Sequence, residues 1–542
     1  MIMNKTHIIA LTTAIFLIFG CTNKKTQLKD FDMHQYIISY FASPNGFDVD
    51  AKIRYKEIVT CLYHENQNEP FWFTDNQPNA QSEQLFDLLA HSMYYGLDTT
   101  LYNLLTITDF KQGLPQDSLL TNENKQSMLG YELCLTQSAI LFFTHLHRGI
   151  MPFDPLSYIT QEAIDSTSSY FKIYDYFDTV SQDSLVNSLY QALTTNNMKE
   201  SVNLLQPQNI HYLSLQTALK EYVQNNPINQ ENIQIVYYEQ DTAWTTTFDN
   251  YRKACLALQK LRWSNIRSTQ YIFINIPSFT LDFVEENTLA LTHKIVCGTT
   301  DKQTPELNSR LKHIELFPDW NIPFSIATKE ILPMVKRNTE YLAKHNYEVL
   351  DTKGNLLDPD SVPWKKYTEK YLPVRIRQTS GQHNSLGIIK FYFENLSAVY
   401  FHDTPAKGLF NRTFRAYSHG CMRLQNAVTF AKKIMEFDND ILHLPQDQLV
   451  AMGIYETQKK KKGQYDANKY GNSAQVIFQN KLQEKEKHIY NVKKDLPIYI
   501  RYLTAYCNED NQLCFTPDFY SRDSVLMLRY NEELEAIIEK WK

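Results

Sequence analysis

Apolar residues in the first half of the chain recur at the spacing of amphipathic helices. The run from Ser82 to His91 places its apolar residues on one helix face, at Leu85, Phe86, Leu88 and Leu89. Gly96 then supplies a helix stop. The same pattern predicts helices over Met128–His147, Leu185–Leu193 and Tyr251–Leu261. We therefore expect a mostly helical domain that extends over residues 21–260.

From residue 261 onwards, short runs of β-branched and aromatic residues replace the helical pattern. They predict strands over Tyr271–Pro277, Phe279–Phe283, Thr292–Cys297, Ile388–Phe393 and Ala398–His402. Between about 326 and 372 the pattern turns irregular and helical, like an insertion into a β domain. The predicted fold class is therefore α+β: a helical domain, then a mostly β domain over 261–455 with an inserted capping subdomain.

Two further segments complete the chain. Residues 456–490 are charged, poor in apolar residues and include four consecutive lysines, Lys459 to Lys462. They predict a linker or a solvated helix, and a binding site for an acidic polymer is the alternative. Residues 491–542 predict a β-hairpin and a helix that complete the fold.

The start of the chain predicts export. The apolar run Ile8–Phe19 is short for a membrane span and has the length expected inside a signal peptide. It leads into Leu17-Ile18-Phe19-Gly20-Cys21, which resembles a bacterial lipobox, although Phe19 is larger than the usual residue there. We therefore expect a signal peptide over 1–20, a lipid anchor at Cys21, and a location on the periplasmic face of a bacterial membrane. An uncleaved anchor and an ordinary secretory signal are the alternatives.

Length and charge narrow the possible partners. A chain of 542 residues is too long for one core, so two or three domains are expected. The 54 basic residues are outnumbered by 60 acidic ones, which gives a net charge of -6. Nucleic-acid binding needs a basic surface, so this balance argues against nucleic acid as a partner.

The eight cysteines fall into groups. Four lie in apolar surroundings and are predicted to be small buried hydrophobic residues: Cys61, Cys134, Cys255 and Cys297. Cys507 and Cys514 flank a polar tip between two β-like runs, so a disulfide across a hairpin and two free thiols are both open. Cys421 alone has histidines nearby, which is typical of a reactive thiol.

The segment around Cys421 contains the parts of a nucleophilic site. The thiolate is the reactive form of cysteine, and His402, which ends a predicted strand, can accept its proton as general base. Gly420 permits a sharp turn. His419 and the backbone N–H groups near Cys421 can form an oxyanion hole. We expect a loop-to-helix junction here, with the dipole of a helix over Ala427–Phe437 favouring the thiolate and Asn426 as its N-cap.

These residues carry a resemblance to a family. His402-Asp403-Thr404-Pro405, followed at suitable spacing by Ser418-His419-Gly420-Cys421-Met422-Arg423, resembles the active-site signature of bacterial cell-wall L,D-transpeptidases. Further matches to the large members with a scaffold domain cover most of the chain: Trp72, Gly96-Leu97-Asp98, Arg262-Trp263, Asn275-Ile276-Pro277, Gln303-Thr304-Pro305, Trp320-Asn321-Ile322-Pro323, Asn384-Ser385-Leu386-Gly387 and Leu503-Thr504-Ala505-Tyr506. One departure is that 222–251 is too short for their usual peptidoglycan-binding module.

The resemblance implies a reaction and its substrate. Cys421 would attack the third residue of a tetrapeptide stem of peptidoglycan, release D-Ala, and pass the acyl group to a neighbouring amine in a 3→3 crosslink. It also implies that the carbonyl of Asp403 fixes the tautomer of His402. No metal or organic cofactor is required, and carbapenem-type inhibitors are expected to acylate Cys421. The capping insertion would exclude water.

The remaining site residues and functions stay open as alternatives. Arg423 is expected to clamp a substrate carboxylate, with a structural salt bridge as the alternative. The other candidate substrate-binding residues are Ser418, Tyr400, Trp320 and Tyr417. Water or a free D-amino acid as acceptor would make the enzyme an L,D-carboxypeptidase or an exchange enzyme. A non-catalytic wall-binding lipoprotein is the third reading, and an intact pair of Cys421 and His402 argues against it.

Overall fold

The computed structural model describes residues 26–151, 182–195, 197–226, 228, 242–439 and 474–541. The expected signal peptide, Cys21 and the four consecutive lysines lie outside these ranges. The chain divides into two compact units. The first comprises Met1–Ile150, Thr179–Gln206 and Asn531–Lys542, and the second comprises Met151–Asp178 and Pro207–Tyr530. Among the described residues, no helix combines the length and apolar character that a membrane span requires.

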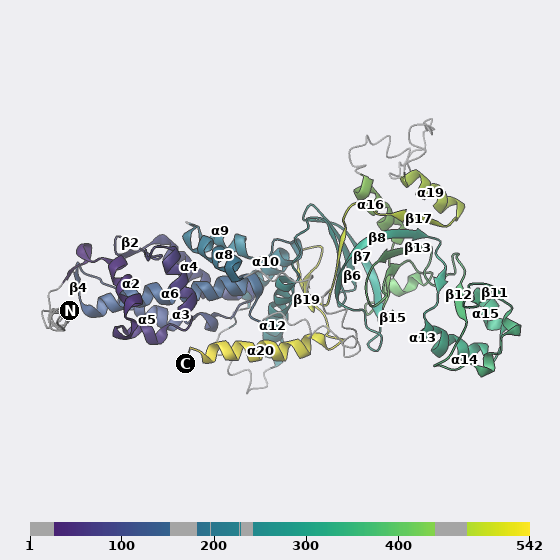
Figure 1. Cartoon of the computed structure of the whole chain (residues 1–542), viewed down its shortest axis with the longest axis horizontal. Helices are drawn as coiled ribbons and strands as arrows, with labels where there is room; N and C mark the ends of the chain where they lie inside the picture. Colours follow the sequence, from purple (N-terminus) through teal and green to yellow (C-terminus); the bar gives the residue numbers. More distant parts are fainter. Residues whose placement is uncertain are drawn as a thin grey trace, which may run out of the picture. The chain divides into compact units, whose positions relative to one another are not determined.

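The first unit is built around the long helix α6, Asn122–Arg148. Nearly every side chain from Met128 to Leu146 is buried, because other helices surround α6 (Figure 1). Its neighbours are α2 (Met33–Ala42), α3 (Lys56–Glu65), α4 (Ala80–Ala90), α5 (Leu104–Gln112), α8 (Gln182–Thr194) and α9 (Met198–Leu205). A capping box at Thr121 fixes the start of α6, since its hydroxyl accepts from the Asn124 N–H. The helical prediction for this part is confirmed.

From Pro207 onwards, the described part of the second unit has helices first and then a β domain. The helices are α10 (Ile210–Asn225) and α12 (Thr242–Trp263). The central sheet has ten strands: β5 (Tyr271–Asn275), β6 (Thr280–Glu285), β7 (Thr288–Gly298), β8 (Leu307–Leu316), β13 (Ile389–Phe393), β14 (Phe401–His402), β15 (Ala416–Ser418), β16 (Met422–Leu424), β17 (His488–Asn491) and β18 (Pro497–Arg501). The α+β class expected from the sequence is thereby confirmed.

Pairing in this sheet closes into a ring. The order runs β13-β14-β16-β7-β6-β5-β18-β8, and β8 pairs with β13 again. Apolar side chains inside the ring pack against helix α16, Ala427–Asn439, whose Phe430 and Ile434 are fully buried. The ring fixes β14 and β16 as direct neighbours, and the candidate site lies on these two strands.

The insertion into the β domain has a core of its own. Its four-stranded sheet has the order β11-β10-β12-β9, with β9 at Trp320–Asn321, β10 at Tyr347–Leu350, β11 at Leu356–Leu357 and β12 at Arg375–Gln378. The helical part comprises α13 (Phe324–Ile326), the π-turn η8 (Ala327–Ile331), α14 (Leu332–Val335) and α15 (Glu340–Lys344). These elements gather as one lobe (Figure 1) around a separate apolar cluster that includes Trp364 and Ile376. We call residues 320–378 the cap.

Residues 456–490, for which a linker or a solvated helix was expected, end in helix α19 (Ala474–Glu484) and strand β17. The helix alternative therefore holds for part of the segment, whereas β17, which belongs to the central sheet, was not expected. Cys507 and Cys514 are free thiols, because the register of β19 (Ala505–Cys507) and β20 (Leu513–Phe515) sets Cys514 opposite Tyr506. Neighbouring strand positions point to opposite faces, so the two thiols diverge. Cys61 is exposed, since α3 buries Val59 and Leu62 instead.

Candidate active site

Strands β14 and β16 bring the predicted nucleophile and base onto one face of the sheet. They run parallel, with Phe401 opposite Met422 and His402 opposite Arg423. Phe401 and Met422 are buried in the core. Because side chains alternate along a strand, the residues on the other face are Tyr400, His402, Cys421 and Arg423. Residues separated in sequence therefore form one polar surface, which we call the thiol face.

The ring of His402 is buried and held by its own strand end. Its Nδ1 lies 2.5 Å from the carbonyl oxygen of Asp403. A carbonyl only accepts, so Nδ1 carries the proton and Nε2 is the acceptor of the neutral ring. Burial lowers the pKa of His402 to about 4, against the opposing effect of the Asp403 carbonyl, so the ring is neutral at pH 7. This is the state that a general base requires.

The thiol of Cys421 is partly buried beside Tyr400. Burial raises its pKa, while hydrogen bonds from Tyr400 and the positive charge of Lys390 act in the opposite direction. The structure gives no hydrogen bond between the Cys421 thiol and the His402 ring. Thiol and imidazole are thus both neutral in the resting site, and proton transfer between them needs a further approach of the two groups.

The turn before Cys421 is fixed by hydrogen bonds from small residues. The Ser418 hydroxyl donates to the carbonyl of Cys421 at 2.6 Å and accepts from the N–H of Gly420 at 3.2 Å. Thr304 donates to the carbonyl of Gly420 at 2.8 Å. Gly420 has φ of +112°, a conformation that other residues rarely adopt. Ser418 is buried, so the structure places this predicted substrate-binding residue inside the turn.

The His419 side chain contacts the cap. Its Nε2 lies 2.5 Å from the carboxylate of Glu330, which also pairs with Lys302 at 3.0 Å. Partial burial opposes ionisation of Glu330, yet hydrogen bonds from these two residues hold its pKa below the usual value. Glu330 belongs to the π-turn of the cap, so one carboxylate joins the cap to the turn that carries Cys421.

The other predicted substrate-binding residues divide between the thiol face and its surroundings. Arg423 lies on the thiol face, burial lowers its pKa, and within the described residues it has no acidic partner at salt-bridge distance. The Trp320 side chain of the cap lies beside the Tyr400 hydroxyl, whose pKa burial raises and Trp320 acts to lower. Tyr417 is 36% exposed and packs against Arg412 and Phe414, outside this group. The structural salt bridge considered for Arg423 is therefore absent among these residues.

The predicted loop-to-helix junction at Cys421 is wrong. The strand β16 and a turn at Gln425 and Asn426 separate the cysteine from α16. The effect of a helix dipole falls off within the first turn, so α16 does not stabilise the thiolate. Asn426 has φ of +51°, and its carbonyl accepts from the N–H of Phe430, the first bond into the helix.

Two residues beside the thiol face were missed by sequence reasoning. Lys390 lies on β13 opposite His402, and Glu315 lies on β8 opposite Lys390. The alternation of Lys390 with the buried Ile389 and Phe391 was a usable signal for its side of the strand. Nothing in the sequence indicated that β8 would pair there.

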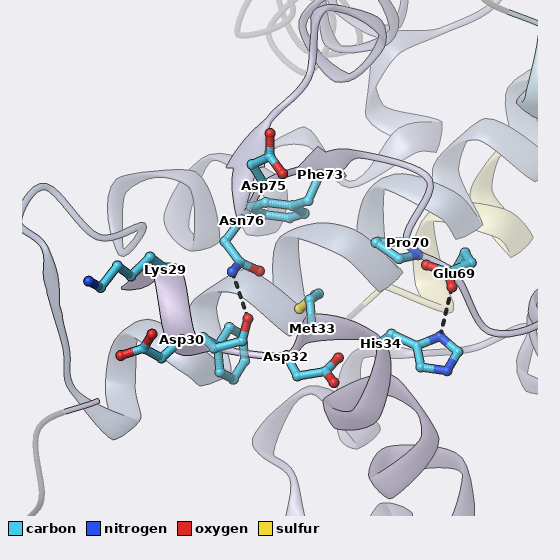
Figure 2. Close-up of a pocket in the computed structure, with 11 residues that line it drawn as sticks. Lys29, Asp30, Asp32, Met33, His34, Glu69, Pro70, Phe73, Asp75 and Asn76 are labelled. Atoms are coloured by element: carbon cyan, nitrogen blue, oxygen red, sulfur yellow. Dashed lines mark hydrogen bonds and ion pairs between the residues drawn. The ribbon is translucent and has the colours of Figure 1, made fainter. Parts of the chain in front are cut away.

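A separate hollow lies in the first unit and lacks a nucleophile. Figure 2 shows it: a shallow space of about 350 Å³ lined by several acids and by His34, whose Nδ1 lies 3.3 Å from Glu69. Asn76 donates to the carbonyls of Leu28 and Phe31 and holds one wall. Among the described residues, no three His, Cys, Asp or Glu side chains are arranged to hold a metal ion. The thiol face is therefore the candidate active site.

Comparison with known proteins agrees with this geometry. Residues 269–450 match the family model of the L,D-transpeptidase catalytic domain, YkuD, and residues 57–219 match that of the Scaffold domain. A Haemophilus influenzae protein named "Putative L,D-transpeptidase" is 31% identical over 257 residues. The match covers 47% of this chain and 45% of that protein, so it spans about half of the relative's length. The family resemblance drawn from the sequence is confirmed for both domains.

Proposed function

We propose that this chain, which belongs to the YkuD L,D-transpeptidases that carry a Scaffold domain, crosslinks peptidoglycan stem peptides through Cys421. The observation that carries the proposal is the pairing of β14 with β16, which sets the thiol and the imidazole on one face. The donor is a tetrapeptide stem, and the product is a 3→3 crosslink. The proposed partners are peptidoglycan stems, and no cofactor is needed for the chemistry.

The reaction proceeds in two steps, acylation of Cys421 and transfer of the acyl group to an amine. The sulfur of Cys421 attacks the carbonyl carbon of the third stem residue, and its proton passes to Nε2 of His402. The bond to the terminal D-Ala breaks, and the same proton leaves with the released amine. An amine of a second stem then attacks the thioester, gives up a proton through His402, and regenerates the thiol.

The turn and the cap supply binding and protection for these steps. In this proposal the oxyanion hole is formed by backbone N–H groups of the turn at Gly420, and one such donor contributes about 3 kcal/mol in comparable enzymes. Arg423, which lacks an acidic partner among the described residues, binds a carboxylate of the stem with two hydrogen bonds. The cap, which has Trp320 beside Tyr400 and is joined through Glu330 to the turn before Cys421, limits water and favours an amine as acceptor.

The nucleophile is tested by acylation with a carbapenem. The wild-type protein and Cys61→Ala, which removes an exposed thiol, should both gain the mass of one inhibitor. Cys421→Ala should gain none, and His402→Ala should acylate at least about a hundredfold more slowly because it lacks the general base. A covalent adduct in Cys421→Ala would overturn the assignment.

The acceptor is tested on purified muropeptides by mass spectrometry. Crosslinked dimers joined between third residues support the proposal. Tripeptides without crosslinks would instead identify an L,D-carboxypeptidase, and incorporation of an added D-amino acid would identify an exchange enzyme. Binding to the wall without any product would identify a wall-binding lipoprotein.

We further propose that the protein is exported and anchored by a lipid at Cys21, on the periplasmic side of a bacterial membrane. The lipobox-like sequence before Cys21 supports this. Radiolabelled fatty acid should enter the wild-type protein and not Cys21→Ala. Equal labelling of both would contradict the lipid anchor.

A further inference from the structure

Two charged side chains extend the thiol face beyond the residues that the reaction uses. Lys390 lies directly opposite His402 across β13 and β14, and Glu315 lies directly opposite Lys390 across β8 and β13. Phe391, the next residue along β13, is buried in the core, so Lys390 points to the side that carries Tyr400 and Cys421. A row of ionisable groups therefore runs from Glu315 to the thiol.

The contacts of Lys390 fix the position of its charge. Its Nζ lies 4.9 Å from the centre of the Tyr400 ring and 3.3 Å from the carboxylate of Glu315. The side chains of Lys390 and Glu315 are only 20% and 26% exposed. Partial burial reduces screening by solvent, so the charges act over a longer distance than on an open surface.

Tyr400 connects this pair to the sulfur. The ammonium of Lys390 lies over its ring, and its hydroxyl lies beside Cys421, where it acts against the rise in the pKa of the thiol that burial causes. The Trp320 side chain of the cap lies beside the same hydroxyl. A cation over the ring also makes the hydroxyl a better donor to a negatively charged sulfur.

We propose that Lys390 is a positioning residue for the nucleophile: held by Glu315 against Tyr400, it stabilises the negative charge that Cys421 develops. The inference rests on the proposed function only in naming Cys421 as the reacting group. The thiol becomes a thiolate before attack, and α16 packs through Phe430 against Phe401 on the core face of β14, opposite the thiol face. Lys390 supplies positive charge on the thiol face instead.

The other groups that face the thiol do not replace this charge. They are Tyr400 and His402 from β14, Arg423 from β16, and Glu315 from β8. His402 is neutral, and Arg423 acts on the His402 ring, whose pKa it lowers. Burial raises the pKa of the Cys421 thiol, and the positive charge that acts against this rise is that of Lys390.

The alternative is that Lys390 and Glu315 form an ordinary cross-strand ion pair without a role at the thiol. Such a pair contributes about 0.2–1 kcal/mol to stability and has no effect on a cysteine. The two readings differ in one measurable quantity, the rate at which Cys421 is alkylated as a function of pH. Measuring this alkylation rate requires neither peptidoglycan nor an inhibitor.

The test follows iodoacetamide alkylation of Cys421 by peptide mass in the full chain. In Lys390→Gln we expect the apparent pKa of the thiol to move upward and the rate at pH 7 to fall about three- to tenfold. Lys390→Arg should restore most of the rate, because it keeps the charge. Glu315→Gln should raise the rate, because the amide oxygen can still accept from the Lys390 ammonium and hold it while the opposing negative charge is removed.

Lys312→Gln, which removes an exposed lysine of β8, serves as the matched control and should leave the profile unchanged. A wild-type profile in Lys390→Gln, with unchanged thermal stability, would overturn the inference. If Lys390 controls alkylation as expected while muropeptides give no product, the inference stands and the proposed transpeptidase function alone fails.

Discussion

At the scale of single residues, the orientation of His402 depends on a glycine outside its own strand. Gly387 has φ of +62°, and a Cβ atom there would overlap the carboxylate of Asp403. That carboxylate accepts from the N–H of Ile388 and from Lys407, and these contacts fix Asp403. The carbonyl of Asp403 in turn orients the His402 ring. The position of the base is therefore set by backbone geometry as well as by its own contacts.

We expect Gly387→Ala to lower the acylation rate at least about tenfold, because displacing Asp403 turns the His402 ring away from the thiol. Gly408→Ala is the control, since a Cβ atom there meets no atom within 4 Å. Carbapenem acylation followed by mass spectrometry measures both rates. A normal rate in Gly387→Ala would show that the Asp403 contact does not orient the base.

Cys421 and His402 could be predicted because each belongs to a short sequence motif. The residues that surround them in the structure could not. The sequence around Cys421 and His402 carries the motif, and the alternation in β14 and β16 then places both on one face. Glu315 is far from both in the sequence, and only strand pairing brings it near. The partner of His419 was missed for the same reason, because Glu330 belongs to the cap.

At the scale of elements, the cap is joined to the catalytic turn through Glu330. Its carboxylate accepts from His419, which precedes Gly420, and from Lys302. The residue sits in a π-turn, an element that frequently marks functional sites. The cap has its own apolar cluster, so it can move as a body if this tie is released.

We expect Glu330→Gln to loosen the cap while leaving its core folded. Amide hydrogen exchange in 324–345 should become about three- to tenfold faster, since a partly exposed ion pair contributes up to about 1 kcal/mol. Glu340→Gln is the matched control, because Glu340 pairs with Lys344 inside the cap and touches no catalytic residue. Equal exchange in the two variants would show that Glu330 does not hold the cap.

Strands and helices in which apolar residues recur at regular spacing could be predicted from the sequence. Those in which this spacing is interrupted could not. Strands β5, β6 and β13 and helix α4 follow the sequence pattern closely. Strand β8 was missed because a register shift opposite Tyr392 and Phe393 inserts an extra residue, which breaks the alternation of Leu311 and Ile314. Strand β16 was missed because three residues are too few to show a period.

At the scale of the whole molecule, each unit keeps ionisable groups in its interior, and these couple folding to pH. In the first unit the buried carboxylate of Glu132 accepts from the hydroxyl of Tyr63 at 2.7 Å and from the N–H groups of Phe71 and Trp72 at 2.6 and 3.1 Å. No cation is among these partners. Burial raises the pKa of Glu132 to about 7, against the opposing effect of the three donors.

Because the pKa of Glu132 is raised in the folded protein, the stability of the first unit should fall as pH rises. A carboxyl whose pKa is higher in the folded state than in the unfolded chain binds its proton more tightly when folded. Its contribution to stability is fully present below the ordinary pKa of 4.5 and is lost as pH rises through about 7. The full loss amounts to about 3 kcal/mol, of which about 1 kcal/mol falls between pH 6 and pH 8.

We therefore expect α6 in the full chain to open more easily at pH 8 than at pH 6. Hydrogen exchange of the α6 amides, corrected for the intrinsic effect of pH, measures the opening free energy directly. In Glu132→Gln the side chain cannot ionise, so the difference between the two pH values should shrink even though the variant is less stable overall. Because Glu132 lies among the described residues of the first unit, far in sequence from Cys421, carbapenem acylation of this variant at pH 6 should stay normal. An opening free energy that rises with pH in the wild type would mean that Glu132 is ionised in the folded protein across this range.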